Sequence, residues 1–304
     1  MKKIFFALIA LMTFPFNLSG QTPTYKSLWK QVETAQEQDL PQTEQKVLSQ
    51  IEQKALAEQA YGQLLKAELQ RARSVCSVAP DSLKPAVERL KQRVVEVEGD
   101  VPLQAIYYCV LGYIYQQNSW LDEDRHNEIG LDYYRLAMAH PAELAQVKAT
   151  DYEPFVVKER DSQYFDHNLL SLISRHTQTY GPLCDYYEHT DNRPATLLAQ
   201  LWQMDSEWPE EMEPFDNSPY LQRLDALIDK YQDLPECGEA VIKRYKFMEL
   251  KTDATPQQKW EYLNEALQRW GKWKGINTLR NSLNAMTTTQ YNYNGEEALL
   301  IPQR

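Results

Sequence analysis

Few residues of this chain have types and spacings that could perform catalysis or hold a metal ion. The five histidines are His126, His140, His167, His176 and His189. None of them stands at metal-ligand spacing from another strong ligand, as zinc sites require. The sequence also has no nucleophile-elbow, zinc-protease, phosphate-loop or dinucleotide-binding motif. We therefore expect no enzyme activity, no catalytic residue, no cofactor and no bound metal.

The cysteines and the clustered carboxylates offer little more. Cys76, Cys109, Cys184 and Cys237 allow three disulfide connectivities, and the sequence does not decide their redox state. Cys109 lies in an apolar stretch, where a buried free thiol is the simpler interpretation. The acidic, proline-containing segment 205–220 lacks the ligand order of a calcium loop, so we interpret it as a solvated loop.

Aromatic and basic residues alternate between Trp260 and Lys274, as in some proteins that bind single-stranded nucleic acid. However, Trp260, Leu263, Leu267 and Trp270 keep helical spacing, which favours a face turned to the core. The net charge of −11 also removes the electrostatic attraction to phosphate on which such binding depends. We expect no nucleic-acid partner.

The elements that position these residues are predicted to be helices almost throughout. Apolar residues recur every three or four positions from Tyr25 to Met286, and prolines such as Pro41 interrupt the pattern. Asp100 is a candidate helix cap ahead of Pro102. Glycine is scarce, with 10 in 304 residues, which argues against folds rich in tight turns. The pattern predicts an all-α fold of paired helices, a bundle or an α-solenoid.

Two internal signals favour the solenoid. A run of seven motif positions follows the tetratricopeptide pattern, with tyrosine in place of tryptophan and a turn longer than the consensus by about nine residues. Its residues are Tyr108, Leu111, Gly112, Tyr115, Tyr134, Ala137 and Pro141. We expect Gly112 to let the second helix approach closely while the aromatic rings fill the gap. In addition, the sequence Gln-Asp-Leu-Pro occurs at 38–41 and again at 232–235, as in a repeated helix–turn–helix unit.

The two ends of the chain differ from its body. Lys2 and Lys3 precede an apolar run and the small residues Ser19 and Gly20, the order of a secretory signal peptide. We expect an exported protein, periplasmic or associated with the cell envelope and soluble after cleavage near Gly20. At the other end, an Asn-Gly turn signal and an apolar run predict a short β-like tail.

These observations predict five segments. They are a signal peptide at 1–20, a first helical-repeat region at 21–204, an acidic loop at 205–220, a second helical-repeat region at 221–286, and the start of a linker or truncated β-domain at 287–304. No run after the signal peptide is long and apolar enough to span a membrane.

One short motif leads to a family. Cys237-Gly238-Glu239-Ala240 differs in one residue from Cys-Gly-Glu-Gln, the thioester motif of complement and macroglobulin proteins. Ala240 has no side-chain amide to acylate the cysteine, so we expect no thioester. Longer stretches nevertheless resemble the helical N-terminal region of the alpha-2-macroglobulin-like proteins of Bacteroidetes. They are residues 28–33, 39–41, 61–67, 80–83, 110–115, 151–155 and 192–195.

The resemblance implies a non-enzymatic interaction or scaffold module. It would be the N-terminal helical part of an exported, protease-trap type protein, and it lacks bait region and thioester. Its partner would be the rest of a macroglobulin-like chain or an envelope protein. The alternative is a free-standing exported helical-repeat protein that binds peptides or envelope proteins in a concave groove.

Overall fold

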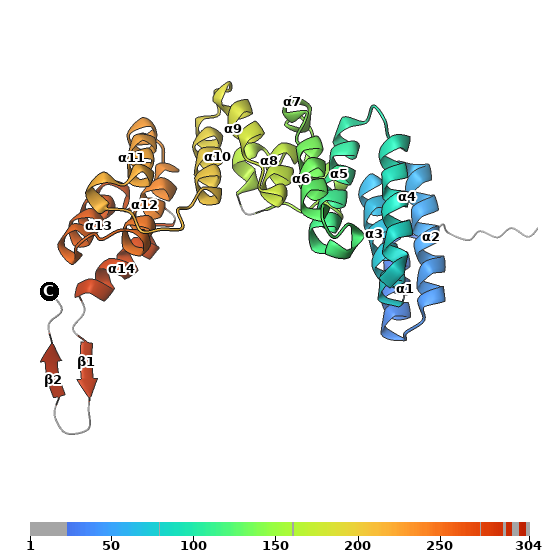
Figure 1. Cartoon of the computed structure of the whole chain (residues 1–304), viewed down its shortest axis with the longest axis horizontal. Helices are drawn as coiled ribbons and strands as arrows, with labels where there is room; N and C mark the ends of the chain where they lie inside the picture. The colour runs from blue at the N-terminus through green and yellow to red at the C-terminus, as the bar shows by residue number, and fades with distance from the viewer. Residues whose placement is uncertain are drawn as a thin grey trace, which may run out of the picture. The chain divides into compact units, whose positions relative to one another are not determined.

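The computed structural model describes residues 23–78, 80–159, 161–273 and 275–287, together with the backbone of 290–293 and 298–301. The predicted signal peptide lies outside the described residues. The part described is mostly helical, with fourteen α-helices and two short strands (Figure 1). The sequence-based prediction of an all-α class is confirmed to this extent.

The chain divides into two compact units, Met1–Leu83 and Lys84–Arg304, which we call unit 1 and unit 2. Unit 1 contains α1 (Tyr25–Glu37), α2 (Pro41–Glu58), α3 (Tyr61–Val78) and the 3₁₀ turn η1 (Pro80–Ser82). The segment 205–220, where the sequence suggested a division between two helical halves, lies inside unit 2.

Unit 2 holds the other helices. The first of them, α4, begins at Leu83, the last residue of unit 1. They are α4 (Leu83–Glu96), α5 (Val101–Gln117), α6 (His126–Ala137), α7 (Pro141–Leu144), α8 (Leu169–Thr177), α9 (Gly181–Glu188), α10 (Arg193–Ser206), α11 (Pro219–Tyr231), α12 (Cys237–Lys251), α13 (Pro256–Trp270) and α14 (Asn277–Thr287). Its 3₁₀ turns are η2 (Ser119–Leu121), η3 (Ala149–Tyr152), η4 (Ser162–Phe165) and η5 (Phe215–Asn217).

Unit 1 is built from amphipathic helices that bury one apolar stripe each. Leu28 of α1 and Leu48 and Ile51 of α2 are almost fully buried in one cluster that also includes Ala67 of α3. Burying a leucine or isoleucine side chain contributes about 1.5–3 kcal/mol. This spacing of apolar residues is what positions the three helices against one another.

A polar network crosses the same three helices. The carboxylate of Glu44 on α2 accepts hydrogen bonds from Gln36 of α1 (2.7 Å) and from Gln70 and Ser74 of α3 (3.1 and 2.6 Å). Glu44 is only 5% exposed. Its buried charge is therefore held by donors from both neighbouring helices, as a buried carboxylate requires.

Unit 2 is built mainly from contacts between helices that follow each other in the chain. α5 packs against α6, α9 against α10, α11 against α12, and α13 against α14, while α5 also contacts α8. The predicted cap is present, because the side chain of Asp100 accepts a hydrogen bond from the backbone N–H of Leu103 (3.1 Å) at the start of α5.

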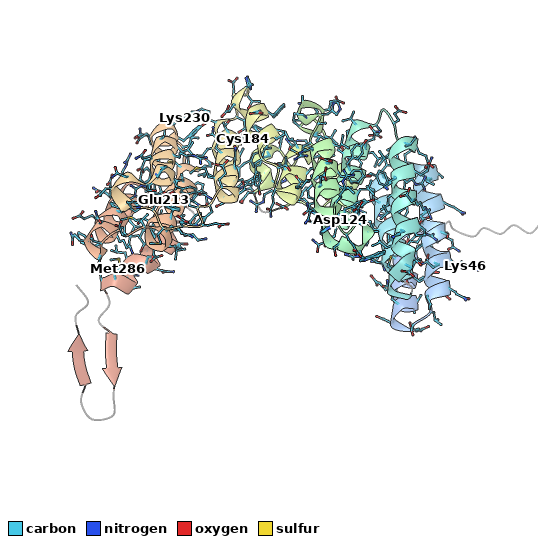
Figure 2. The ribbon with its side chains drawn as sticks, in the orientation of Figure 1. Lys46, Asp124, Cys184, Glu213, Lys230 and Met286 are labelled. Carbon is cyan, nitrogen blue, oxygen red and sulfur yellow. The ribbon has the colours of Figure 1, made fainter. Side chains whose placement is uncertain are left out.

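The acidic segment between α10 and α11 exposes most of its carboxylates but is anchored to α12. The ring of Trp208 lies against those of Tyr220 and Phe247, at 5.5 and 5.1 Å between centroids. Glu213, labelled in Figure 2, accepts hydrogen bonds from the Ser218 hydroxyl and the backbone N–H of Tyr220, and its own N–H donates to the last carbonyl of α12 (2.8 Å). Its contacts with α11 and α12 therefore hold the segment in place, while most of its carboxylates face solvent.

The two Gln-Asp-Leu-Pro sequences adopt different turns. In the first, Asp39 has a left-handed backbone (φ 54°) and Pro41 is the first residue of α2. In the second, one residue, Glu236, separates Pro235 from the start of α12, and Asp233 forms an ion pair with Arg193 (2.6 Å). The echo in sequence therefore does not correspond to a repeated turn geometry.

At the end of the chain, β1 (Gln290–Tyr293) and β2 (Ala298–Ile301) pair antiparallel, with Gln290 opposite Ile301. The side chains of 288–304 and the turn between the strands lie outside the described residues. The prediction that a β-domain begins here stays a prediction.

Candidate functional site

The predicted repeat motif lies at the crossing of α5 and α6. A side-chain carbon at Gly112 would come within 3.0 Å of the Tyr134 ring and of the backbone oxygen of Gly130. Tyr108 and Tyr115 both contact the ring of Tyr133, at 6.1 and 5.8 Å between centroids. The expected close approach at Gly112, with aromatic rings between the helices, is the arrangement present.

The other motif residues serve the same packing. Leu111 and Ala137 are buried at 0% and 1% exposure, and Tyr134 at 7%. Pro141 is the first residue of the four-residue helix α7 and comes four residues after Ala137, the last residue of α6. These positions form structural contacts and none of them lines the cleft described below.

One serine–histidine pair has the separation that nucleophilic catalysis uses. The hydroxyl of Ser162 lies 2.8 Å from Nδ1 of His167. However, the same hydroxyl donates its hydrogen to the backbone oxygen of Glu159 (2.7 Å), and Ser162 is 1% exposed. Since the proton is already engaged and the oxygen is buried, the pair stabilises the η4 turn.

The four cysteines carry free thiols. Burial raises the pKa of Cys109 and Cys184 to about 12 and that of Cys237 to about 11. Burial also raises the pKa of the half-buried Cys76. The Cys237 thiol donates to the backbone oxygen of Ile228 at 3.6 Å, at the base of α12.

Thiol labelling should therefore separate Cys76 from the rest. With Ellman's reagent at pH 8, we expect one fast thiol per native chain, because a thiol with a pKa of 11 or above stays protonated and unreactive. All four should react after unfolding in guanidinium. A Cys76→Ser variant should lose the fast phase. A fast phase that persists in this variant, or a total below four, would contradict these assignments.

Among the residues that the structure describes, no three histidine, cysteine or carboxylate side chains gather closely enough to hold a metal ion. None of the described helices combines the length and apolarity needed to cross a membrane.

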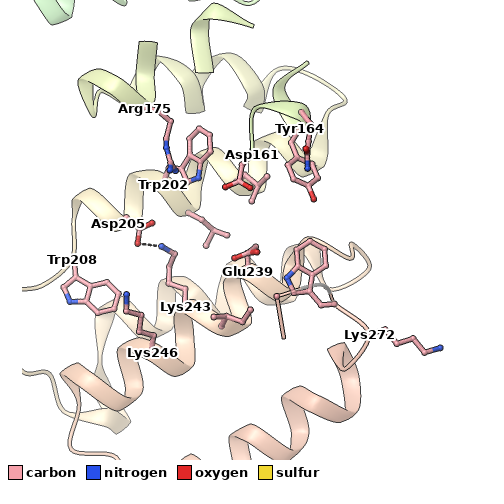
Figure 3. Close-up of a pocket in the computed structure, with 16 residues that line it drawn as sticks. Asp161, Tyr164, Arg175, Trp202, Asp205, Trp208, Glu239, Lys243, Lys246 and Lys272 are labelled. Atoms are coloured by element: carbon pink, nitrogen blue, oxygen red, sulfur yellow. Dashed lines mark hydrogen bonds and ion pairs between the residues drawn. The ribbon is translucent and has the colours of Figure 1, made fainter. Parts of the chain in front are cut away.

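Aromatic, basic and acidic side chains line a cleft in unit 2, with a volume of about 660 Å³. Figure 3 shows its two walls, one from α10 and the chain around η4 and α8, the other from α12. Its lining residues are Asp161, Gln163, Tyr164, Arg175, Leu198, Leu201, Trp202, Asp205, Trp208, Glu239, Ile242, Lys243, Lys246, Lys272, Trp273 and Gly275.

Aromatic rings form much of this lining. Trp202 of α10 is 7% exposed and packs against Phe165 with 4.7 Å between centroids. The guanidinium of Arg175 lies over the Trp202 ring at 4.5 Å, and the ammonium of Lys246 lies 5.7 Å from the Trp208 ring. Such pairs hold flat surfaces and cations in fixed positions along the cleft.

The ring of Trp273 is placed by the absence of a side chain at Gly238. A side-chain carbon on Gly238 would lie within 3.0 Å of three ring carbons of Trp273. The indole Nε1 is buried and has no hydrogen-bond partner within the chain. The Trp273 ring is therefore held at the cleft by packing against the backbone of α12. A hydrogen bond from Nε1 does not contribute.

An ion pair joins the two walls of the cleft. Asp205, at the end of α10, accepts a hydrogen bond from the ammonium of Lys243 on α12 (Figure 3). Burial lowers the pKa of Lys243, and the Asp205 carboxylate opposes that effect. The pair sets the separation of the walls near the middle of the cleft.

No spacing or motif in the sequence predicted this cleft. Its residues come from segments between 161 and 275 that have no common spacing. Lys272 and Trp273, in the alternating patch at 260–274, line the cleft, although the sequence pattern predicted a core face there. The expected core position of Trp260 is wrong, because that side chain is 42% exposed and Leu263 and Ala266 supply the buried face of α13.

Comparisons of the chain with protein-family models, with curated proteins and with solved structures found no match in any of the three.

Proposed function

We propose that this chain is a non-enzymatic protein-interaction module whose unit 2 cleft takes a peptide segment of a partner. The observation that carries the proposal is the cleft itself, which combines three tryptophans with cations and carboxylates. Aromatic side chains are enriched in protein interfaces because they provide large contact areas at low entropic cost. Its volume of about 660 Å³ matches a short segment of side chains rather than a whole domain.

The consecutive packing of helix pairs supports a tetratricopeptide-like solenoid as the scaffold of this module. The close crossing at Gly112 is the feature of that repeat best represented here. In a solenoid, grooves between successive pairs are the usual places where peptides lie, which agrees with the position of the cleft.

We further propose that the module is the N-terminal helical region of an exported alpha-2-macroglobulin-like protein, supported by the sequence resemblance. In that case the bait region and thioester belong to other domains, and the module docks to the trap body or to an envelope protein. The alternative is a free-standing exported repeat protein with the same cleft. A reading frame that continues beyond codon 304 into short alternating strands would favour the first.

A peptide selection tests the interaction function. Random dodecapeptides displayed on phage should yield binders to the full chain with dissociation constants in the micromolar range. Titration calorimetry should show that Lys246→Glu combined with Lys272→Glu weakens these binders at least about ten-fold. Both lysines are exposed in the cleft, so the fold should survive their replacement.

The matched control is Lys158→Glu combined with Lys230→Glu, which makes the same change in net charge at exposed positions outside the cleft. Binding to this control should stay within about two-fold of the unmodified chain. Selected peptides that bind both double variants equally well would overturn the assignment of the cleft.

A further inference from the structure

Cations outnumber carboxylates among the described side chains that line the unit 2 cleft. Three carboxylates line it together with four cations, which are Arg175, Lys243, Lys246 and Lys272. The chain as a whole carries a net charge of −11. The cleft is therefore a locally basic site on an acidic protein, and such a site attracts acidic groups.

Most of these charges already have partners within the chain. Arg175 forms an ion pair with Glu159 (3.3 Å), and Lys243 forms one with Asp205. The Glu239 carboxylate also interacts with other groups of the chain, among them Lys243. These side chains therefore do not depend on a ligand for a partner.

Lys246 of α12 and Lys272, two residues after the end of α13, are different. Both side chains are exposed, and neither forms an ion pair among the residues that the structure describes. Lys246 lies over the Trp208 ring at 5.7 Å and close enough to Lys243 to lower the pKa of that lysine, although burial is the larger cause. An anion beside Lys246 would therefore be attracted by two ammonium groups.

The two lysines lie at opposite ends of the cleft. Figure 3 shows Lys246 beside Trp208 toward one end and Lys272 toward the other, with Asp161 and Glu239 between them. Along the cleft a cation is thus followed by carboxylates and then by a second cation. A ligand that fits this order has an acidic group at each end and none in the middle, where Asp161 would repel it.

The rest of the lining favours a peptide over a polyanion. Apolar and aromatic side chains make up much of it, namely Leu198, Leu201, Trp202, Trp208, Ile242 and Trp273. An acidic polysaccharide or a nucleic acid would leave these surfaces without apolar contacts, and outside the cleft it would meet an acidic chain. A peptide can place apolar side chains on these surfaces and acidic ones at both ends.

On the basis of the proposed function, we infer that the cleft recognises a peptide segment with two acidic residues separated by an apolar stretch. One acidic residue binds Lys246 and the other binds Lys272. A single exposed ion pair contributes little to affinity, so the preference depends on both pairs forming at once. The apolar stretch lies along Trp202 and Trp208.

Pools of fluorescent nonapeptides test this inference on the full chain. In each pool two glutamates, or two glutamines in their place, flank three to five randomised apolar residues. By fluorescence polarisation, the glutamate pool should bind at least about five-fold more tightly than the glutamine pool, its uncharged isostere. Lys246→Gln combined with Lys272→Gln should reduce this preference to less than about two-fold and leave the affinity of the glutamine pool unchanged. A third glutamate in the middle of the segment should weaken binding, because Asp161 lies there.

The matched control, Lys158→Gln combined with Lys230→Gln, removes two exposed lysines outside the cleft and should retain the preference. If the glutamine pool binds as tightly as the glutamate pool, the cleft binds peptides and the inference of two acidic residues fails. The inference also fails if the preference persists without Lys246 and Lys272, or if a peptide of nine glutamates binds more tightly than the glutamate pool. If no pool binds, both the inference and the proposed function fail.

Discussion

Replacing Gly112 by alanine is expected to lower the free energy of unfolding by about 2 kcal/mol. Alanine has the better helix propensity, by about 1 kcal/mol, but the added carbon would lie within 3.0 Å of both the Tyr134 ring and a backbone oxygen of α6. Overpacking costs about 1–3 kcal/mol, and the backbone contact places this case at the upper end. Calorimetry should show a melting temperature lower by roughly 4–8 °C.

A double-mutant cycle isolates the cause. Combining Gly112→Ala with Tyr134→Ala should cost less than the sum of the single changes by about 1 kcal/mol, because the ring contact is absent. Gly112→Ala should still lower stability in the Tyr134→Ala background, because the backbone oxygen of Gly130 would lie 2.9 Å from the added carbon. Gln117→Ala, at an exposed position of the same helix, should change stability by less than about 0.5 kcal/mol. Strictly additive losses would show that the Tyr134 ring does not limit the space at Gly112.

Replacing Gly238 by alanine is expected to cost a similar amount for a different reason. The new carbon would overlap three carbons of the Trp273 ring, so the ring must leave its place on α12. We expect unfolding free energy to fall by about 2 kcal/mol. Peptide affinity should fall as well, because Trp273 lines the cleft.

The variant Trp273→Ala tests whether the Trp273 ring is the reason for this loss. Without the ring, Gly238→Ala should become stabilising by up to about 1 kcal/mol, because only the helix propensity difference remains. Chemical unfolding of the four chains measures the change of sign. A loss of 2 kcal/mol in both backgrounds would mean that another contact, and not Trp273, requires glycine at 238.

The sequence predicted those features that depend on neighbours in the chain. The spacing of apolar residues predicted helices, Asp100 predicted a cap, and Gly112 with Tyr134 predicted a close helix crossing. These signals arise within one helix or between two consecutive helices. They could be recognised because the periodicity of a helix relates sequence spacing directly to a shared face.

The cleft was not predictable in this way. Asp161 and Glu239 face each other only because α12 and the η4 region lie on opposite walls (Figure 3). The repeated Gln-Asp-Leu-Pro shows the same limitation, because Asp233 is engaged by Arg193 while Asp39 adopts a left-handed backbone. Contacts between distant segments decided both outcomes.

The network around Glu44 has a consequence for how unit 1 can move. A slide of one helix along its neighbour by one turn is a movement of about 5.4 Å. Here the same carboxylate accepts hydrogen bonds from α1 and α3 at once. A slide of either helix would leave a buried charge short of donors, which costs several kcal/mol. Glu44 therefore opposes movement of α1 and of α3 along their axes relative to α2. We expect the surface that unit 1 presents to a partner to stay the same for this reason.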